Sequence, residues 1–208
     1  MPLATIELPT PVGTLIAEPL TPEAFAEFGG SIISADHQLK TMETSMANYG
    51  TANKISQVCP VFNSYEKAPS GKPATTNLNL FRSSRPESVT VEADKYKYNL
   101  TVLERHPFTT QTFLPMGVPA DQIAFLVTVA KQGPDGLPDF STVKSFYAVG
   151  NQAVTYGHAA WHAPMVALND RVDFAVLVAE NFVGNEDLNE VYYTPGFPIE
   201  VPLFKASL

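Results

Sequence analysis

The stretch KYKYNLTVLERH, residues 95–106, decides the fold class because two kinds of side chain alternate along it. Its even-numbered positions are apolar or aromatic up to Val102 and then end in Glu104 and His106, whereas the odd-numbered positions are mostly polar. Successive side chains of a β-strand point to opposite faces, so the pattern predicts a strand with one face toward a core. Glu104 and His106 continue that inward face, either as the wet end of the strand or as an acid and an imidazole in a pocket.

Outward from this strand, short runs rich in Val, Phe, Tyr and Thr predict further strands. Prolines make up 18 of the 208 residues, and most of them lie between these runs. Many short strands joined by turns predict a mainly β fold, a barrel or a sandwich whose interior can hold a small ligand. The predicted strands are residues 88–93, 111–116, 123–130, 144–149, 162–168, 174–180 and 199–204.

A single short helix is predicted near the N-terminus. Thr21 suits the N-cap, Pro22 suits the first helical position, and Glu23 suits the positive end of the helix dipole. A Gly-Gly pair a few residues later ends this helix. The polar residues 36–80 show only weak periodicity and give no clear prediction.

The length of 208 residues is that of one domain, so residues 1–208 are predicted to form a single domain. Lys and Arg number 13 against 21 Asp and Glu, which gives a net charge of −8. Because nucleic acids and anionic membranes bind basic surfaces, neither is an expected partner. The apolar runs are far shorter than the roughly 20 residues that a membrane helix needs.

Cys59 is the only cysteine, which excludes an intramolecular disulfide and a cysteine-rich zinc site and fits a reducing compartment. The N-terminal segment lacks the basic and apolar regions of a signal peptide. We therefore expect a soluble cytoplasmic protein. The final residues 206–208 resemble a peroxisomal targeting signal but lack the basic residue at its middle position, so a peroxisomal location is the less favoured alternative.

A second informative stretch, YGHAAWHAPMVAL at residues 156–168, contains His158 and His162. Their spacing would suit shared metal binding from a helix, but Gly157 and Pro164 argue against a helix here. On a strand, His162 is either a hydrogen-bonded core residue beside a tryptophan or part of a site. His158 is predicted to lie in a solvated turn before that strand.

Other polar residues have both a functional and a plain structural interpretation. Arg82 and Arg85 follow an apolar pair and suit either a two-pronged clamp for a substrate carboxylate or an ordinary surface position. The acidic residues between 170 and 190 are predicted to form a solvated rim and not a cation site. No glycine-rich phosphate loop, GxSxG elbow or HExxH motif occurs, and Cys59 has no histidine nearby in sequence that would activate it.

Several long motifs resemble those of the ureidoglycolate lyase family, and together they extend from residue 21 to about residue 193. The segment ERHPFTTQTFLPMG at 104–117 is similar to the central motif of the family. The segment AVTYGHAAWHAPMVAL at 153–168 is similar to its second motif. The remaining similar segments are DFAVLVAENFVGNEDLNE (173–190), NYGTANK (48–54) and FRSS (81–84), the last two as in fungal members.

This resemblance implies a cupin-like β-barrel, a homodimer and a site inside the barrel. Four residues correspond to the metal ligands of cupins, namely Glu104, His106, Gln111 and His162. Glutamate replaces the first cupin histidine, and glutamine replaces the cupin glutamate. The resemblance therefore leaves two possibilities open, one weakly held divalent metal such as nickel or zinc, or no metal at all.

The resemblance also implies cleavage of ureidoglycolate into glyoxylate and urea, a step of allantoin and purine degradation. The expected catalytic residues are Glu104, His106, His162 and Tyr156. A cation, Arg82 before Lys54, is expected to hold the substrate carboxylate. Gln111 and Asn48, together with the tyrosine, are expected to contact urea or the developing carbonyl oxygen.

Two other classes of function remain open at the level of sequence. A metal-dependent cupin dioxygenase or isomerase would use the same barrel with tightly bound iron or manganese. A non-catalytic cupin that binds a small molecule would need neither a metal nor an acid–base pair. Release of urea separates the lyase from both, and a hydrolase acting on the same substrate would give ammonia and carbon dioxide instead.

Overall fold

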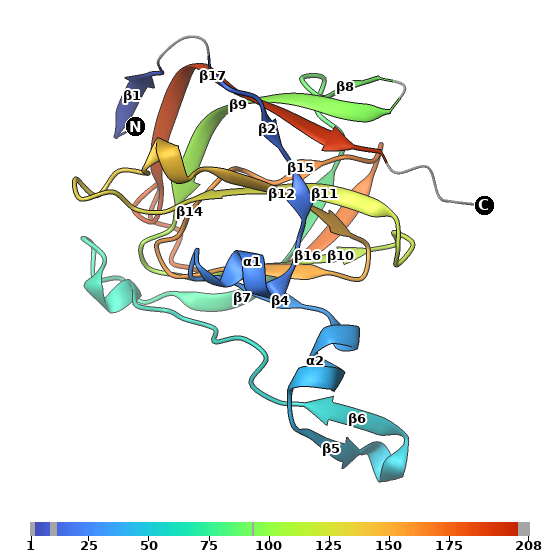
Figure 1. Cartoon of the computed structure of the whole chain (residues 1–208). Helices are drawn as coiled ribbons and strands as arrows, with labels where there is room; N and C mark the ends of the chain where they lie inside the picture. Colours follow the sequence, from blue (N-terminus) through green and yellow to red (C-terminus); the bar gives the residue numbers. More distant parts are fainter. Residues whose placement is uncertain (1–2, 9–11, 93, 204–208) are drawn as a thin grey trace.

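The computed structural model describes residues 3–8, 12–92 and 94–203 of the chain. These residues fold mainly into β-strands with a few short helices, so the predicted fold class is confirmed (Figure 1). The segment 206–208, considered above as a targeting signal, lies outside the described residues. Within the described ranges, no helix is both long and apolar enough to cross a membrane.

Ten strands form the larger sheet, in the order β1-β17-β9-β14-β11-β12-β3, with β2, β8 and β15 paired beside this path. Its longest ladder joins β9 and β17 in antiparallel fashion. The strands are β1 (Ala4–Glu7), β2 (Leu15–Ile16), β3 (Glu18–Pro19), β8 (Thr90–Val91), β9 (Lys95–Arg105), β11 (Ile123–Ala130), β12 (Lys144–Val149), β14 (Trp161–His162), β15 (Val166–Ala167) and β17 (Asn189–Pro202).

The smaller sheet has five antiparallel strands in the order β4-β13-β10-β16-β7. These strands are β4 (Ser31–Ile33), β7 (Thr75–Ser83), β10 (Gln111–Met116), β13 (Ala153–Tyr156) and β16 (Val172–Glu180). A separate hairpin consists of β5 (Thr44–Ala47) and β6 (Ala52–Ile55), joined by the 3₁₀ turn η1 (Asn48–Gly50). We call residues 44–55 the hairpin arm, because Figure 1 shows it standing clear of both large sheets.

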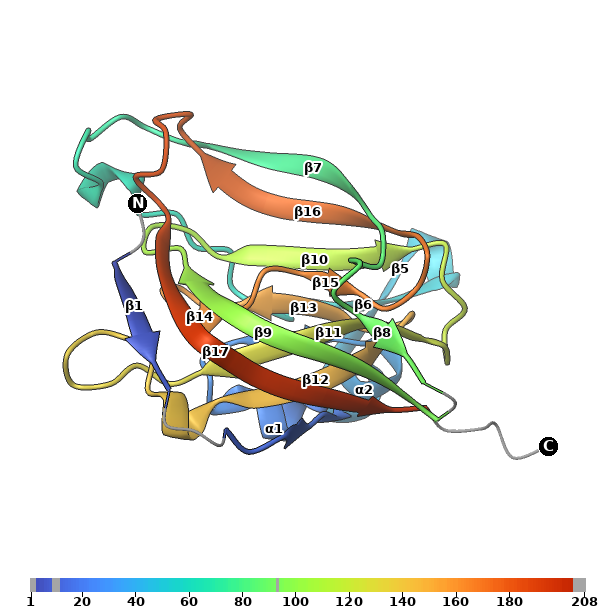
Figure 2. The same ribbon diagram turned by 90° about the horizontal axis from the view of Figure 1, so that it is seen from above.

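The two large sheets pack face to face, and Figure 2 shows them as layers. The rings of Phe125 on β11 and Phe174 on β16 meet edge to face between the layers, with centroids 5.3 Å apart. Val127 and Val176 lie in the same buried cluster, and burial of each such side chain contributes about 1.5–3 kcal/mol. No ladder joins the two sheets within the described residues, so the fold is a cupin-like β-sandwich and not the closed barrel that we expected.

Strand β9 departs from the strict alternation that predicted it. Leu100 and Leu103, three residues apart, are both fully buried in the same cluster. The ladder from β17 onto β9 is interrupted between Tyr192 and Phe197, and such an irregularity re-aims the side chains around it. The expectation that position 103 lies on a polar face is therefore wrong.

The predicted N-terminal helix is confirmed as α1 (Pro22–Ala26). The side chain of Thr21 caps it, since Oγ1 accepts the backbone N–H of Ala24 at 3.2 Å. Phe25 anchors the helix in the core and is 1% exposed. A Cβ atom at Gly30 would lie 2.2 Å from the Phe25 ring, so the glycine that ends this segment is required for packing.

Sequence reasoning missed the elements in the polar part of the chain. These are β5, β6, β7, α2 (Ala35–Thr41) and η2 (Tyr65–Lys67). It also missed β1 to β4, β13 and the first part of β17, and a further 3₁₀ turn, η3, spans Phe140–Thr142. Strand β7 shows why: the side-chain amides of Asn77 and Asn79 donate to Glu180 of β16 at 2.9 and 3.0 Å. Its polar residues are satisfied across the ladder, so it lacks the apolar pattern by which strands are recognised.

Candidate active site

Three strand ends bring the expected catalytic residues to one place. Glu104 is the penultimate residue of β9, and its partner in the neighbouring strand β14 is His162. His106 follows directly after β9. On the smaller sheet, Tyr156 at the end of β13 pairs with Gln111 at the start of β10. Contacts between the rings of Tyr156 and His162, and a cavity lined by both His106 and Gln111, join the two sets.

Two imidazoles share the Glu104 carboxylate. Oε1 of Glu104 lies 3.9 Å from Nε2 of His106 and 3.8 Å from Nε2 of His162. The ligand-type atoms of the three residues all lie within 4.8 Å of one another. One carboxylate between two imidazoles can hold a proton and pass it to a bound molecule.

Backbone carbonyls fix the orientation of both imidazole rings. Nδ1 of His106 lies 2.7 Å from the carbonyl oxygen of Asp187, and Nδ1 of His162 lies 2.9 Å from that of Ala160. A carbonyl oxygen only accepts, so Nδ1 is the donor in each ring. Each Nε2 atom therefore faces Glu104 and is available for chemistry.

His162 is held neutral inside the protein. Its side chain is 3% exposed, and among the described residues its Nε2 atom has no hydrogen-bond partner. Burial, together with the nearby His106, lowers the pKa of His162 to about 4, against an opposing effect of Glu104. At neutral pH His162 thus offers a free lone pair at Nε2.

Tyr156 lies against His162 as a second buried polar group. The two rings are stacked, with centroids 3.9 Å apart and planes at 11°. Burial and the charge of Glu104 raise the pKa of Tyr156, so its hydroxyl stays protonated. This hydroxyl has no hydrogen-bond partner among the described residues. The Tyr156 hydroxyl is therefore a donor without an acceptor, and the ring beside it carries His162 Nε2, an acceptor without a donor.

Glu104 remains ionised in this environment. Burial alone would raise the pKa of its carboxyl, but its interactions with His106 and His162 outweigh burial and lower it. A carboxylate that is both partly buried and negatively charged stabilises an imidazolium formed beside it.

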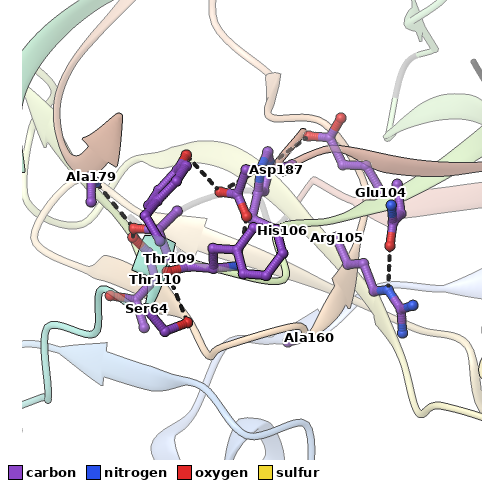
Figure 3. A network of polar contacts seen from close by, with 12 residues as sticks. Ser64, Glu104, Arg105, His106, Thr109, Thr110, Ala160, Ala179 and Asp187 are labelled. Carbon is purple, nitrogen blue, oxygen red and sulfur yellow. Dashed lines mark hydrogen bonds and ion pairs between the residues drawn. The ribbon is translucent and has the colours of Figure 1, made fainter. Parts of the chain in front are cut away.

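Asp187 belongs to the same polar network, shown in Figure 3 with Glu104 and His106. Its carboxylate accepts the backbone N–H of Phe108 at 2.6 Å and the hydroxyl of Tyr65 at 3.2 Å. It also lies 3.7 Å from Nδ1 of His106. Burial raises the pKa of Asp187, opposed by these hydrogen bonds and by the neighbouring imidazole.

Our expectation that the acidic residues between 170 and 190 form a solvated rim is wrong for Asp187, whose side chain is only 10% exposed. No local sequence pattern distinguishes Asp187 from the acidic residues around it. Its position depends on contacts with segments about 80 and 120 residues away in the chain. Local periodicity carries no information about such contacts.

A cavity of about 360 Å³ opens beside His106. Its wall includes Gln111, Asp187 and, from strand β7, Asn79 and Phe81. This volume lies in the range of small-molecule sites. No lysine or arginine of the described residues lines the cavity.

The residues expected to bind the substrate carboxylate are not at this cavity. Arg82 lies on β7 but is exposed, and its Nε and Nη2 donate to Asp173 at 2.9 and 3.2 Å. Lys54 on β6 and Asn48 in η1 both belong to the hairpin arm, at a distance from strands β9 and β14 that is plain in Figure 1. The structure therefore does not bring Arg82, Lys54 or Asn48 to the catalytic cluster of their own chain.

His158 lies apart from the cluster, as the sequence predicted. It is exposed in the turn before β14, and its ring contacts Phe62 at a centroid distance of 4.6 Å. The expected contrast with the buried His162 is confirmed.

The cluster also fits a divalent metal ion. Two imidazole Nε2 atoms and one carboxylate oxygen are a donor set that nickel, zinc and iron accept. The hydrogen bonds from each Nδ1 to a carbonyl are the outer contacts that metal-binding histidines usually make. Gln111 lines the same cavity and could supply a weak fourth ligand.

A mainly β sandwich that holds two histidines and a glutamate at one end defines a cupin-like protein with an acid–base or metal site. The family model for ureidoglycolate lyase matches residues 12–200, so the chain belongs to the ureidoglycolate lyase family.

Curated relatives agree with this assignment over most of their length. The chain is 40% identical to the ureidoglycolate lyase of Schizosaccharomyces pombe over 187 residues, which cover 90% of this chain and 94% of the relative. It is 41% identical to the ureidoglycolate lyase of Saccharomyces cerevisiae, over 88% of this chain and 96% of the relative. The ureidoglycolate lyase of Brucella anthropi is 33% identical, over 88% and 90% of the two chains.

Proposed function

We propose that this protein is an enzyme that cleaves ureidoglycolate into glyoxylate and urea. Membership of the family and the names of its relatives support the substrate. The observation that carries the chemistry is the pair of imidazole Nε2 atoms, 3.8 and 3.9 Å from one oxygen of Glu104, with His106 on the wall of a small cavity.

The reaction needs one base and one acid, and it consumes no water. A single carbon of ureidoglycolate bears a hydroxyl, a carboxylate, a hydrogen and a urea nitrogen. When the hydroxyl loses its proton, the oxygen forms the carbonyl of glyoxylate and the carbon–nitrogen bond breaks. The departing nitrogen takes up a proton and leaves as urea.

The cluster supplies groups for each of these steps. Nε2 of His162, which is neutral and has an unused lone pair, accepts the hydroxyl proton, and the Glu104 carboxylate stabilises the resulting imidazolium. His106 on the cavity wall, in its protonated form, delivers its Nε2 proton to the leaving nitrogen, and the Glu104 carboxylate between the two Nε2 atoms then returns the proton from His162 to His106. The hydroxyl of Tyr156 donates to the developing carbonyl oxygen, and Gln111 contacts the urea group.

A bound divalent ion, held by Glu104, His106 and His162, would polarise the substrate hydroxyl and lower its pKa. The proton transfers described above use only the side chains of this chain. Metal analysis of the purified protein, combined with activity before and after chelation, shows which description applies.

The decisive experiment is incubation of the purified protein with racemic ureidoglycolate and separate measurement of glyoxylate, urea and ammonia. Equal amounts of glyoxylate and urea without ammonia are expected. Glyoxylate accompanied by ammonia would show a hydrolase, and consumption of dioxygen would show an oxygenase. The absence of any product, with ligand binding retained, would show a binding protein.

The proposal includes a homodimer in the cytoplasm. A single cysteine, which suits a reducing compartment, supports the location. Sedimentation at micromolar concentration tests the dimer, and fluorescence microscopy of the chain tagged at its N-terminus tests the location.

A further inference from the structure

The cavity lacks a group that its proposed substrate requires. Ureidoglycolate carries a carboxylate, and a buried carboxylate needs a cation or several hydrogen-bond donors. The cavity wall is instead acidic, since Glu180 and Asp187 both line it and Glu104 lies close by. No arginine or lysine of the described residues contributes to this wall.

Two arginines adjacent in sequence to residues of the site, Arg105 beside Glu104 and Arg82 beside Phe81, are occupied elsewhere. The guanidinium of Arg105 donates to Gln132, Asn189 and the carbonyl of Gly136, and it lies 4.7 Å from the Trp161 ring centroid. Arg82 forms a two-pronged ion pair with an aspartate on the exposed side of its sheet. Neither arginine is available to a ligand in the cavity.

Whereas the cavity lacks a cation, the hairpin arm carries a cation that has no partner within the described residues. Lys54 of β6 is exposed, and within the described residues no ion pair or hydrogen bond of its side chain is found. Strands β5 and β6 pair only with each other in the described part of the chain. Met46 is 66% exposed, and Tyr49 at the tip is fully exposed. A two-stranded hairpin without further packing is marginally stable in water, so this arm needs a surface to lie on.

The hairpin arm cannot reach the cavity of its own chain. In Figure 1, strand β14 lies at the left of the sandwich, whereas strands β5 and β6 project below it on the right, and Figure 2 also shows them on the side opposite to β14. The arm of a second copy is free of this restriction.

The cavity rim offers a surface that suits such an arm. Phe182 is 80% exposed and Phe81 is 46% exposed, and both line the cavity. Phe81 belongs to β7, which is the last strand of its sheet and has an open edge within the described residues. An exposed edge with apolar side chains is prone to pair with another chain.

We propose that the hairpin arm of one copy docks at the cavity rim of a second copy and places Lys54 over the cavity as the carboxylate-binding residue. A two-fold symmetric dimer then exchanges two arms and completes two sites, each with the catalytic cluster of one chain and the lysine of the other. Asn48, in the turn of the same arm, reaches the same site. This inference rests on the proposed function for the identity of the ligand, while the docking of the arm does not.

A first experiment detects the docked arm without any catalysis. A carbodiimide couples a lysine amine to an adjacent carboxylate, and mixed dimers of ¹⁴N- and ¹⁵N-labelled chains reveal which couplings join two copies. We expect an interchain link between Lys54 and Glu180 or Asp187. Lys54→Arg keeps the charge but cannot be coupled, so the link should vanish in this control. A monomer in sedimentation, or a dimer without this link, would overturn the proposal.

A second experiment tests whether Lys54 acts across the interface. Two heterodimers are purified by means of two different tags. One joins a Lys54→Ala chain to a His106→Ala chain, and the other joins a wild-type chain to a chain with both substitutions. At substrate concentrations well below KM, exchanged arms leave the first heterodimer one intact site and about half of the wild-type rate, whereas the second keeps at most about a twentieth of it. The reverse pattern would show that Lys54 acts within its own chain and would overturn the proposal.

The two experiments separate this inference from the proposed function. If the wild-type protein forms no urea but the interchain link appears, the function is wrong and the docked arm stands. If urea forms but the heterodimers show the reverse pattern, the function stands and the exchanged arm is wrong.

Discussion

The catalytic end of the sandwich and the hairpin arm are built in opposite ways. At the catalytic end, the orienting contacts come from the same chain: backbone carbonyls orient the two imidazoles, and Asp187 accepts hydrogen bonds from two separate segments. In the hairpin arm, strands β5 and β6 pair only with each other in the part of the chain that the structure describes, and most side chains are exposed.

The side chains of the catalytic cluster are thus preorganised, whereas those of the hairpin arm become ordered only when they contact a second surface. Catalysis by proton transfer requires donors and acceptors that are already in place, because reorganisation would add to the barrier. A lysine that binds the substrate carboxylate does not need to be in place in advance, because it becomes ordered when the exposed hairpin contacts a second surface. Another chain can therefore supply it. The following substitutions test each side of this comparison.

The largest effect is expected at the cluster. His106→Ala, and His162→Asn as a variant that preserves a hydrogen bond to the carbonyl of residue 160, should each lower kcat by about 100-fold or more. Each removes a group that transfers a proton in the proposed reaction. Initial rates of urea formation give kcat, and circular dichroism shows whether the variants are folded.

The matched control is His158→Ala, in the exposed turn before β14. This imidazole lies outside the cluster, so kcat should change less than about twofold. An unchanged kcat in both His158→Ala and His162→Asn would show that the second motif does not contribute to catalysis, and equal large losses would show that the contrast between the two histidines is wrong.

A smaller loss is expected when the cation of the hairpin arm is removed. Lys54→Ala should lower kcat/KM by roughly 10- to 100-fold, mainly through KM, because the substrate carboxylate loses its charged partner. Lys54→Arg should recover much of this activity, since it keeps the charge. Lys40→Ala, which removes an exposed lysine from α2, is the control and should behave as the wild type. An unchanged KM in Lys54→Ala would exclude Lys54 from the site.

The sequence predicted the residues of the cluster better than it predicted their surroundings. Glu104, His106 and His162 lie in long family motifs, and the ladder between β9 and β14 pairs Glu104 with His162. Local periodicity alone did not place Glu104, because the alternation of β9 is broken before it and Leu103 is buried in the same cluster as Leu100.

The position of Arg82 could not be predicted from the sequence. Phe81 lines the cavity, whereas Arg82, one residue later on β7, pairs with Asp173 on the exposed side of the sheet. A shift of one residue moves a side chain to the other face, and the polar sequence of β7 gave no register. The position of the hairpin arm was equally out of reach, because in the described residues β5 and β6 pair only with each other and lie far from the cluster in the chain fold.

A further loss of about tenfold is expected from Asp187→Asn. Asp187 is a positioning residue, because its carboxylate lies 3.7 Å from Nδ1 of His106 and binds the N–H of Phe108. The amide retains one acceptor but removes the charge, so kcat should fall while KM stays within about twofold. Asp187→Glu should restore part of kcat if charge is the cause. Parallel losses of kcat and thermal stability in both variants would show a merely structural role.

The smallest effect is expected at the ion pair that occupies Arg82. Hydrogen bonds from Arg82 and Arg171 lower the pKa of Asp173 to about 2, from an ordinary value of 3.8. A carboxyl whose pKa is lower in the folded state adds stability above its unfolded pKa, and this contribution is lost as pH falls toward its folded pKa. Thermal unfolding of the wild type and of Asp173→Asn should therefore differ slightly at neutral pH and converge between about pH 4 and pH 2. Arg82→Ala should show a weaker form of the same pH dependence, because Arg171 still binds the carboxylate at 2.8 Å.

Since Arg82 is exposed and faces away from the cavity, its removal should leave KM for ureidoglycolate unchanged, in contrast to Lys54→Ala. If KM rises in Arg82→Ala but not in Lys54→Ala, then Arg82 and not Lys54 binds the substrate carboxylate.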